Sequence, residues 1–228
     1  MNQSITLVVW AIATLIIGIV GAQLSWRSLQ MRMMANGLVG ELLAFAHKVG
    51  IPFAALIFGV LGQDLIGLGR PSPNSLLGFA EGAWVAGLMR VALAVTAVAA
   101  ILWLMGREQA KVAAVPSPLL SLRDTLYDEA HWAFYFSAGA LWLNDAYWGV
   151  LIGISLVVME TLLHPRLRNQ LVTQHGGQHL LLRSLCLLCS GLLYAGPQNL
   201  WLMFLSDAVI RLAGPYLLQP ARQSRLQS

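Results

Sequence analysis

The sequence predicts an all-α, polytopic membrane protein: a transmembrane helical bundle with about seven spans. Of its 228 residues, 57% are hydrophobic and only 11% are charged, whereas soluble domains carry about a quarter charged residues. The mean hydropathy is +0.68. The apolar residues gather in long runs, and a helix satisfies all of its backbone hydrogen bonds within one segment in lipid. We therefore expect a single transmembrane domain over residues 1–228.

Seven apolar runs are candidates for the spans, since crossing a bilayer takes about 20 residues in a helix. The first run has no basic segment before it and no convincing cleavage site after it, so we predict a retained span and not a signal peptide. The last four runs are shorter, which a helix partly buried in the bundle tolerates. The predicted spans are Ile5–Leu24, Leu38–Leu61, Ala83–Met105, Glu129–Leu143, Ala146–Leu163, His179–Ala195 and Asn199–Leu218.

The distribution of Lys and Arg predicts how these spans are oriented. With the N-terminus outside, the cytoplasmic loops and the C-terminus hold nine cations, and the opposite side holds only Arg70. The nine are Arg27, Arg32, Arg107, Lys111, Arg123, Arg166, Arg168, Arg222 and Arg225. This asymmetry is the one that the positive-inside rule describes. We expect a bacterial inner (cytoplasmic) membrane protein with its C-terminus in the cytoplasm. Its basic charge reflects contact with the lipid bilayer and requires no nucleic-acid partner.

Ionisable residues in or beside the spans are the candidate functional groups, because a charge at membrane depth costs at least a few kcal/mol and usually marks a site or a satisfied pair. They are Asp128, Glu129, His131, Glu160, His164, Asp207 and Arg211. The predicted topology puts Asp128 and Glu129 at the cytoplasmic entrance of the fourth span and His164 at the same end of the fifth. Asp207 lies near mid-membrane. We expect these groups to converge on a cavity open to the cytoplasm.

Three short motifs in this order resemble the CPBP family of intramembrane proteases, which includes CAAX-processing and bacteriocin-processing enzymes. Asp128-Glu129 is similar to the family's Glu-Glu-x-x-x-Arg motif, and His164 follows where a later helix ends in His. The segment LLYAGPQNLWLMFLSDAVIRL (192–212) looks like the final motif, and LLGFAEGAWVAGLMR (76–90) looks like an earlier helix of the family. The resemblance covers about residues 76–218, which leaves the spans 5–24 and 38–61 outside it.

The resemblance implies catalytic roles for Asp128, Glu129, His164, Asp207 and Arg211. In the family, the acidic pair and the histidine are thought to activate a water, and the last motif supports an oxyanion.

This chain departs from the pattern at several positions. Asp128 replaces a Glu, Ala133 replaces the Arg, Asp207 replaces a His and Arg211 replaces an Asn. An ionised Asp207 would repel an oxyanion, and Arg211, four residues later, is spaced to pair with it on the same helix face. The loss of one oxyanion donor costs about a hundredfold to a thousandfold in rate. The departures therefore predict a degenerate active site.

Each of the other polar features has a structural interpretation beside the functional one. Glu129 and His131 can bond neighbouring loops, with Asp128 as a helix N-cap, and Glu160 can pair with His164 at i, i+4. We expect three further features to be structural: buried apolar roles for Cys186 and Cys189, a loop at HGGQH (175–179), and snorkelling or pairing of Glu41 and Lys48. We predict no metal ion and no cofactor.

Two principal functions follow from the sequence. The first is a membrane scaffold or an accessory subunit of a membrane-protein complex, built on a CPBP-type bundle without catalysis. The second is an active glutamate-type intramembrane endopeptidase that processes a membrane protein or a prenylated or peptide substrate. A pathway for protons or small molecules through the same buried groups is a weaker third interpretation.

Overall fold

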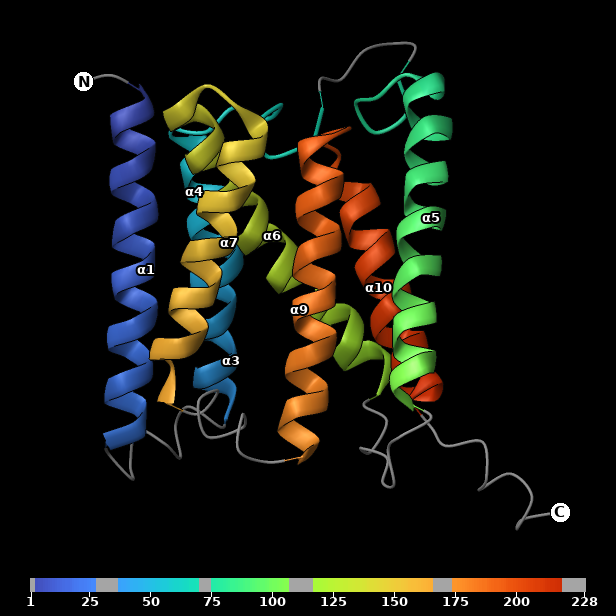
Figure 1. Ribbon diagram of the computed structural model, residues 1–228. Helices are drawn as coiled ribbons and strands as arrows, with labels where there is room; N and C mark the ends of the chain where they lie inside the picture. Colours follow the sequence, from blue (N-terminus) through green and yellow to red (C-terminus); the bar gives the residue numbers. More distant parts are fainter. Residues whose placement is uncertain (1–2, 28–36, 70–74, 107–116, 166–173, 219–228) are drawn as a thin grey trace, which may run out of the picture.

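The computed structural model is a helical bundle without β-strands in the part of the chain that it describes, residues 3–27, 37–69, 75–106, 117–165 and 174–218 (Figure 1). The all-α prediction is confirmed. The helical segments are α1 (Gln3–Arg27), α3 (Leu38–Phe45), η1 (Ala46–Gly50), α4 (Ile51–Ile57), α5 (Glu81–Gly106), α6 (Pro118–Leu143), α7 (Ala146–Leu163), α9 (Gln174–Ala195) and α10 (Leu200–Leu217).

The helices run up and down the bundle in alternation, with α3, η1 and α4 forming one continuous crossing (Figure 1). Six crossings are long and apolar enough to span a membrane, and the remaining one is α6. In Figure 1, α1 lies at one side of the bundle and α5 at the other, with α10 packed against α5 and α9. An arrangement of seven crossings agrees with the predicted number of spans.

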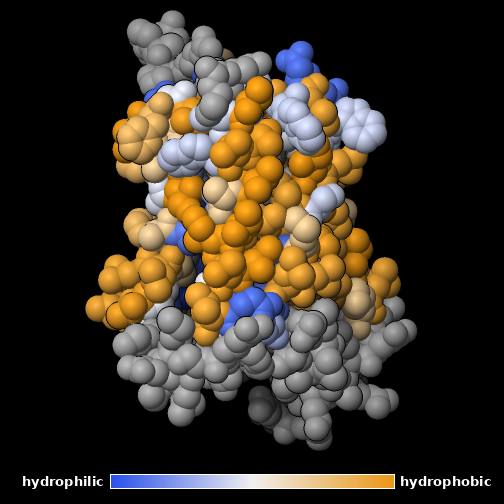
Figure 2. All heavy atoms as spheres, turned by 90° about the vertical axis from the view of Figure 1, so that its left-hand side faces the viewer, coloured by the Kyte–Doolittle hydropathy of each residue, from blue (hydrophilic) through white to orange (hydrophobic). Residues whose placement is uncertain are grey.

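The outside of the bundle is apolar. Figure 2 shows a belt of hydrophobic side chains around the middle of the molecule, on the face that carries α1. Large apolar side chains on the outer helices are widely exposed, among them Ile16 at 54%, Leu93 at 73% and Leu192 at 72%. Such a continuous apolar surface is suited to lipid and not to water. The chain is an integral membrane protein.

The helix α6 is the centre of the bundle and begins at Pro118, earlier than the predicted start of the fourth span at Glu129. The Ser117 side chain caps it by accepting a hydrogen bond from the Leu120 N–H at 3.3 Å, and Pro118 occupies the first turn, where its missing N–H is not needed. Polar residues early in α6 concealed this start from a hydropathy pattern. As a result, Asp128 lies about 15 Å along the helix and not at its entrance.

The second crossing contains a π-helical turn, η1, where the sequence predicted a uniform helix. The N–H of Ile51 bonds the carbonyl of Ala46, five residues earlier. Pro52 follows at once; it has no N–H to donate, and its ring conflicts with the carbonyl four residues before it. The wider turn relieves this conflict and changes the directions of His47 and Lys48, which both lie on it.

The helices α6 and α7 form a tight antiparallel hairpin. Asn144, in the left-handed region at φ 53°, ends α6, and the Asp145 side chain caps α7 by accepting from the Trp148 N–H at 3.0 Å. A Cβ on Gly139 would lie 2.7 Å from the carbonyl oxygen of Gly149, so the two backbones are in direct contact. Gly149, at the start of the GVLIG segment (149–153), therefore permits close packing of the two helices, as its small size predicts.

The helix α9 begins at Gln174, so the HGGQH segment lies within a helix and its predicted loop conformation is wrong. Cys186 and Cys189 are free and buried, as expected for small apolar residues of this helix.

Candidate functional site

Two polar clusters lie on different faces of α6. We call the first the charge network; it comprises Lys48, Asp128, Glu129, Arg183, Ser190, Asp207 and Arg211. We call the second the histidine cluster; it comprises His47, His131 and Glu160. Because consecutive helical positions are about 100° apart, the neighbouring residues 128, 129 and 131 of one helix reach partners on several surrounding helices.

Asp128 is the centre of the charge network. Its Oδ1 atom lies 2.7 Å from Nζ of Lys48 on η1 and 3.5 Å from a terminal nitrogen of Arg183 on α9. Its Oδ2 atom lies 2.7 Å from a terminal nitrogen of Arg211 on α10. The residue is only 3% exposed. One buried carboxylate therefore ties α6 to three other helical segments through cations.

Arg211 bridges two buried carboxylates. Besides its contact with Asp128, its Nε atom donates to Oδ2 of Asp207 at 3.0 Å. The guanidinium carbon lies 5.9 Å from the centre of the Trp132 ring. The i, i+4 pairing of Asp207 with Arg211 expected from the sequence is confirmed. The guanidinium is held between two acids and an indole, and its Nε atom and one terminal nitrogen each donate to a carboxylate.

Glu129 lies on the side of α6 that faces α9 and α10. Its Oε1 atom accepts a short hydrogen bond from the hydroxyl of Ser190 on α9. Its Oε2 atom is buried without a hydrogen-bond partner among the described residues. Asp207 is close enough for the two acidic groups to interact electrostatically. Glu129 is 1% exposed and Asp207 is 0% exposed, so these carboxyl groups are packed inside protein and do not line an open surface.

Three acidic and three basic side chains meet in this network, so their formal charges cancel when all are ionised. The acids are Asp128, Glu129 and Asp207, and the bases are Lys48, Arg183 and Arg211. The presence of cations beside these acids is favourable, because an unpaired charge in a low-dielectric interior is costly.

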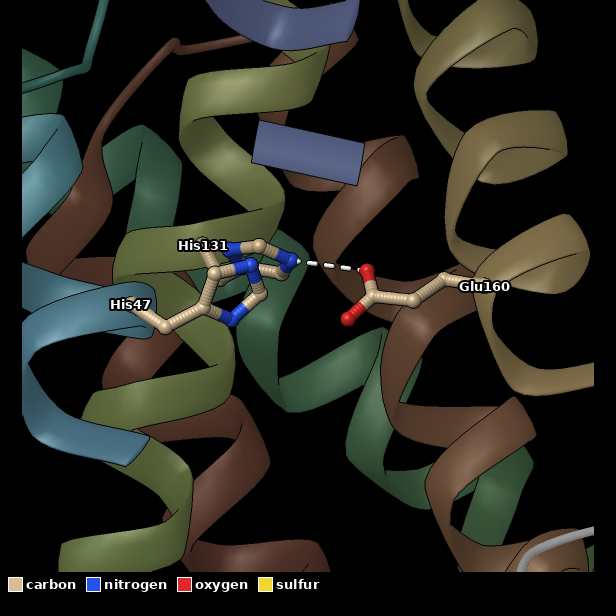
Figure 3. A group of neighbouring side chains, drawn as sticks. All are labelled: His47, His131 and Glu160. Carbon is tan, nitrogen blue, oxygen red and sulfur yellow. Dashed lines mark hydrogen bonds and ion pairs between the residues drawn. The ribbon is translucent and has the colours of Figure 1, made fainter. Parts of the chain in front are cut away.

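The histidine cluster joins η1, α6 and α7 (Figure 3). Nε2 of His131 lies 2.9 Å from Oε2 of Glu160, and the hydroxyl of Tyr135 lies 3.4 Å from the same oxygen. The rings of His47 and His131 lie one over the other in Figure 3, with their centroids 4.9 Å apart. His131 is 1% exposed. Glu160 thus contacts α6, where the sequence suggested a partner on its own helix.

The π-helical turn gives His47 and Lys48 separate roles. Nε2 of His47 lies 3.0 Å from the carbonyl oxygen of Thr14 on α1, and its ring faces the histidine cluster (Figure 3). Lys48, the next residue, reaches Asp128 in the charge network. Because His47 and Lys48 are adjacent on this turn, the turn links the two clusters. Gly18 of α1 lies close to His47: a Cβ at Gly18 would lie 2.9 Å from Cε1 of His47.

The structure brings together four of the five predicted catalytic residues. Asp128, Glu129, Asp207 and Arg211 all belong to the charge network. His164 is half-buried and caps the C-terminal end of α7, where its extended conformation at ψ 112° precedes Pro165. Its helix presents Glu160, one turn earlier, to His131 and not to Glu129. Ala133, which the resemblance places where the family has Arg, is completely buried.

His47 and Arg183 also belong to these clusters, although the sequence pattern did not predict it. Both stand far from their partners along the chain, 84 residues separating His47 from His131 and 55 separating Arg183 from Asp128. Their presence within apolar runs was the available signal, since an ionisable residue at membrane depth needs a partner.

No protein-family model, curated protein or solved structure matches this chain. Kinship with the CPBP family therefore stays a prediction. The function has to be inferred from the geometry of the two clusters.

Proposed function

We propose that the chain is a noncatalytic membrane scaffold or accessory subunit, related to CPBP proteases but without their peptidase activity. The bridge from Arg211 to both Asp128 and Asp207 is the observation that supports this proposal. A peptidase of that type would need an acid free to take a proton from water and a donor free to bind an oxyanion. Here three of the corresponding residues, Asp128, Asp207 and Arg211, bind one another.

The contacts of Asp128 also support the scaffold role. Both of its oxygens contact cations, and these cations come from three different helical segments. A carboxylate held in this way fixes the positions of the helices around it and offers little access to a water or a peptide bond. The apolar outer belt supplies surface on which a membrane-protein partner or lipid can lie (Figure 2).

One observation favours the alternative function, an active glutamate-type endopeptidase. Glu129 has a carboxylate oxygen without a hydrogen-bond partner among the described residues. An oxygen of this kind in a buried site is suited to accept a proton from a nucleophilic water. The alternative requires access for water and substrate to a residue that is 1% exposed.

Replacement of Glu129 by Gln separates the two functions. The amide oxygen can still accept the Ser190 hydrogen bond, so we expect normal abundance of the variant. In cells that lack the protein, the scaffold proposal predicts that E129Q restores growth and the pattern of membrane-protein termini as well as wild type does. Terminal-peptide profiling of the membrane fraction measures this. A cleavage that wild type restores and E129Q does not would establish the endopeptidase instead.

The partner expected of an accessory subunit gives a second measurement. When membranes with native levels of the chain are mildly solubilised, the chain should migrate in native gel electrophoresis as part of a larger assembly. The reference is the purified 24.8 kDa chain in the same detergent, which should migrate faster. Identical migration of the two samples under mild solubilisation would contradict the accessory-subunit role.

A further inference from the structure

We propose that His47, His131 and Glu160 form a binding site for one divalent transition-metal ion inside the bundle. One ligand atom from each side chain lies within 4.8 Å of the other two, and Nε2 of His131 is already 2.9 Å from Oε2 of Glu160. Around an ion with bonds of about 2.0–2.2 Å, neighbouring ligand atoms are separated by about 3–3.5 Å. Side-chain shifts of about an ångström therefore bring all three to one ion.

The ligand types define the class of ion. Imidazole nitrogens with one carboxylate suit Zn²⁺ and its neighbours in the first transition row, whereas Mg²⁺ and Ca²⁺ prefer oxygen ligands alone. Three protein ligands leave a fourth position of a tetrahedral ion for a water. The Tyr135 hydroxyl, 3.4 Å from Oε2 of Glu160, is placed to bond that water or the carboxylate.

The surroundings of His47 match those of metal-bound histidines. Such a histidine usually donates its second ring N–H to a backbone carbonyl or a carboxylate, which fixes the ring and selects the ligating nitrogen. Nε2 of His47 lies 3.0 Å from the carbonyl oxygen of Thr14, a residue that is 1% exposed. With Nε2–H donated to that carbonyl, the lone pair of Nδ1 remains for an ion.

His131 would bind the ion through Nε2, the atom that points at Oε2 of Glu160. Its Nδ1 atom is buried without a hydrogen-bond partner among the described residues. In the empty cluster Nε2–H donates to Glu160, whereas with an ion Nε2 is a ligand and the ring proton lies on Nδ1. This change of tautomer therefore breaks no hydrogen bond at Nδ1.

The backbone of α1 covers the cluster at Gly18. A Cβ there would lie 2.9 Å from Cε1 of His47 and 3.1 Å from Oε1 of Glu160, so only a glycine leaves this space unfilled. The Glu160 side chain is 18% exposed, whereas that of His131 is 1% exposed. The cluster is thus enclosed on the histidine side and accessible at its carboxylate, as a buried ion site requires.

The competing interpretation is a His131–Glu160 ion pair without any ion. Metal titration distinguishes the two. The full-length chain, purified in detergent without a polyhistidine tag and stripped with a chelator, is titrated with Zn²⁺, with Co²⁺ as a spectroscopic probe and with Mg²⁺ as a selectivity control. We expect roughly one equivalent of Zn²⁺ to remain after gel filtration. Bound Co²⁺ should show the intense visible absorption of a site with few ligands, and Mg²⁺ should not compete.

Variants assign the ion to these residues. E160Q keeps the shape of the side chain and can still accept the His131 hydrogen bond, yet we expect Zn²⁺ binding to weaken by more than about tenfold, as it should in H47Q. The matched control is H179A, which removes an exposed histidine of α9 outside the cluster. It should bind Zn²⁺ as wild type does, and gel filtration verifies that each variant is monodisperse.

Two results would overturn the proposal. Wild-type chain that retains no Zn²⁺ leaves only the ion pair, and equal retention by wild type and E160Q locates the ion elsewhere. Should H47Q fail to fold, E160Q alone decides. Because the readout is ion binding and not processing or partner association, it is independent of the function proposed above.

Discussion

Arg211 is positioned to hold two buried carboxylates together, so its replacement should be far more damaging than the loss of an exposed cation. In R211M, Asp128 loses its 2.7 Å contact and Asp207 loses its 3.0 Å contact. Breaking a buried pair by removing one partner costs about 3–5 kcal/mol, because a buried charge is left uncompensated. Thermal unfolding in detergent, followed by circular dichroism, measures the loss.

Arg123 provides the matched control on the same helix as Asp128. It pairs with Glu41 at 2.7 Å, but the two side chains are 35% and 51% exposed. Exposed pairs contribute about 0–1 kcal/mol, so R123M should unfold nearly as wild type does. Equal destabilisation by R211M and R123M would contradict the bridging role of Arg211.

The pairing of Asp207 with Arg211 could be predicted from the sequence because one helix carries both residues, four positions apart. The partners of Asp128 could not. Lys48 lies 80 residues before it and Arg211 lies 83 residues after it, so only the packing of helices brings them together. Local spacing is informative within a helix, whereas contacts between helices depend on rotations and tilts that a single sequence does not specify.

At the scale of the helix, the contact between α6 and α7 depends on the absence of a side chain at position 149. In G149V, the added side chain would meet the backbone of Ala140, and rigid backbone cannot move aside. We expect destabilisation of about 1–3 kcal/mol, the usual cost of overpacking. Denaturant titration of the purified chain measures it.

Gly82 of α5 is the control for this change, since a Cβ there meets nothing within 4 Å. In a helix, replacing Gly by Ala usually stabilises by about 0.5–1 kcal/mol. G82A should therefore be neutral or stabilising, while G149V is harmful. Comparable losses of stability in both variants would contradict the tight packing of α6 against α7.

The π-helical turn should couple Pro52 to the charge network. In P52A, a restored N–H at position 52 can bond the carbonyl of Lys48, which favours an ordinary α-helical turn and rotates Lys48 away from Asp128. P52A and K48M should then be non-additive in stability, with an interaction energy of about 0.5–3 kcal/mol. A double-mutant cycle by thermal unfolding measures it. E41Q, which alters an exposed pair, should add independently to P52A.

Most helices could be predicted from apolar runs: α5, α7 and α10 have ends within two residues of those expected. The start of α6 and the turn in η1 could not. A hydropathy pattern detects helices that face lipid. Because the middle of α6 is surrounded by protein, this helix can hold charged residues, and these hide it from a hydropathy pattern. The π-helical turn depends on a conflict at Pro52 that a hydropathy pattern does not contain.

At the scale of the whole molecule, seven crossings in the described residues place the start of α1 and the end of α10 at opposite ends of the bundle, so we expect them on opposite sides of the membrane (Figure 1). Many of the loop cations from which we predicted an outside N-terminus, such as Arg32, Arg107 and Arg166, lie outside the described residues. In a bacterial host, green fluorescent protein fused to the C-terminus should be fluorescent, and alkaline phosphatase fused there should be inactive. A cytoplasmic location permits the fluorescence and prevents the phosphatase activity. The reverse pattern would invert the orientation without changing the bundle.

The central place of a polar helix has a consequence for biogenesis. On leaving the ribosome, α6 presents Asp128 and Glu129 to the translocon well before Arg183 and Arg211 have been synthesised. Insertion of such a segment alone is unfavourable, since an acidic residue at mid-helix costs about 2.5–3.5 kcal/mol on insertion scales. Stable integration of α6 should therefore await α9 and α10, which makes about the last quarter of the chain a requirement for the middle of the protein to enter the membrane.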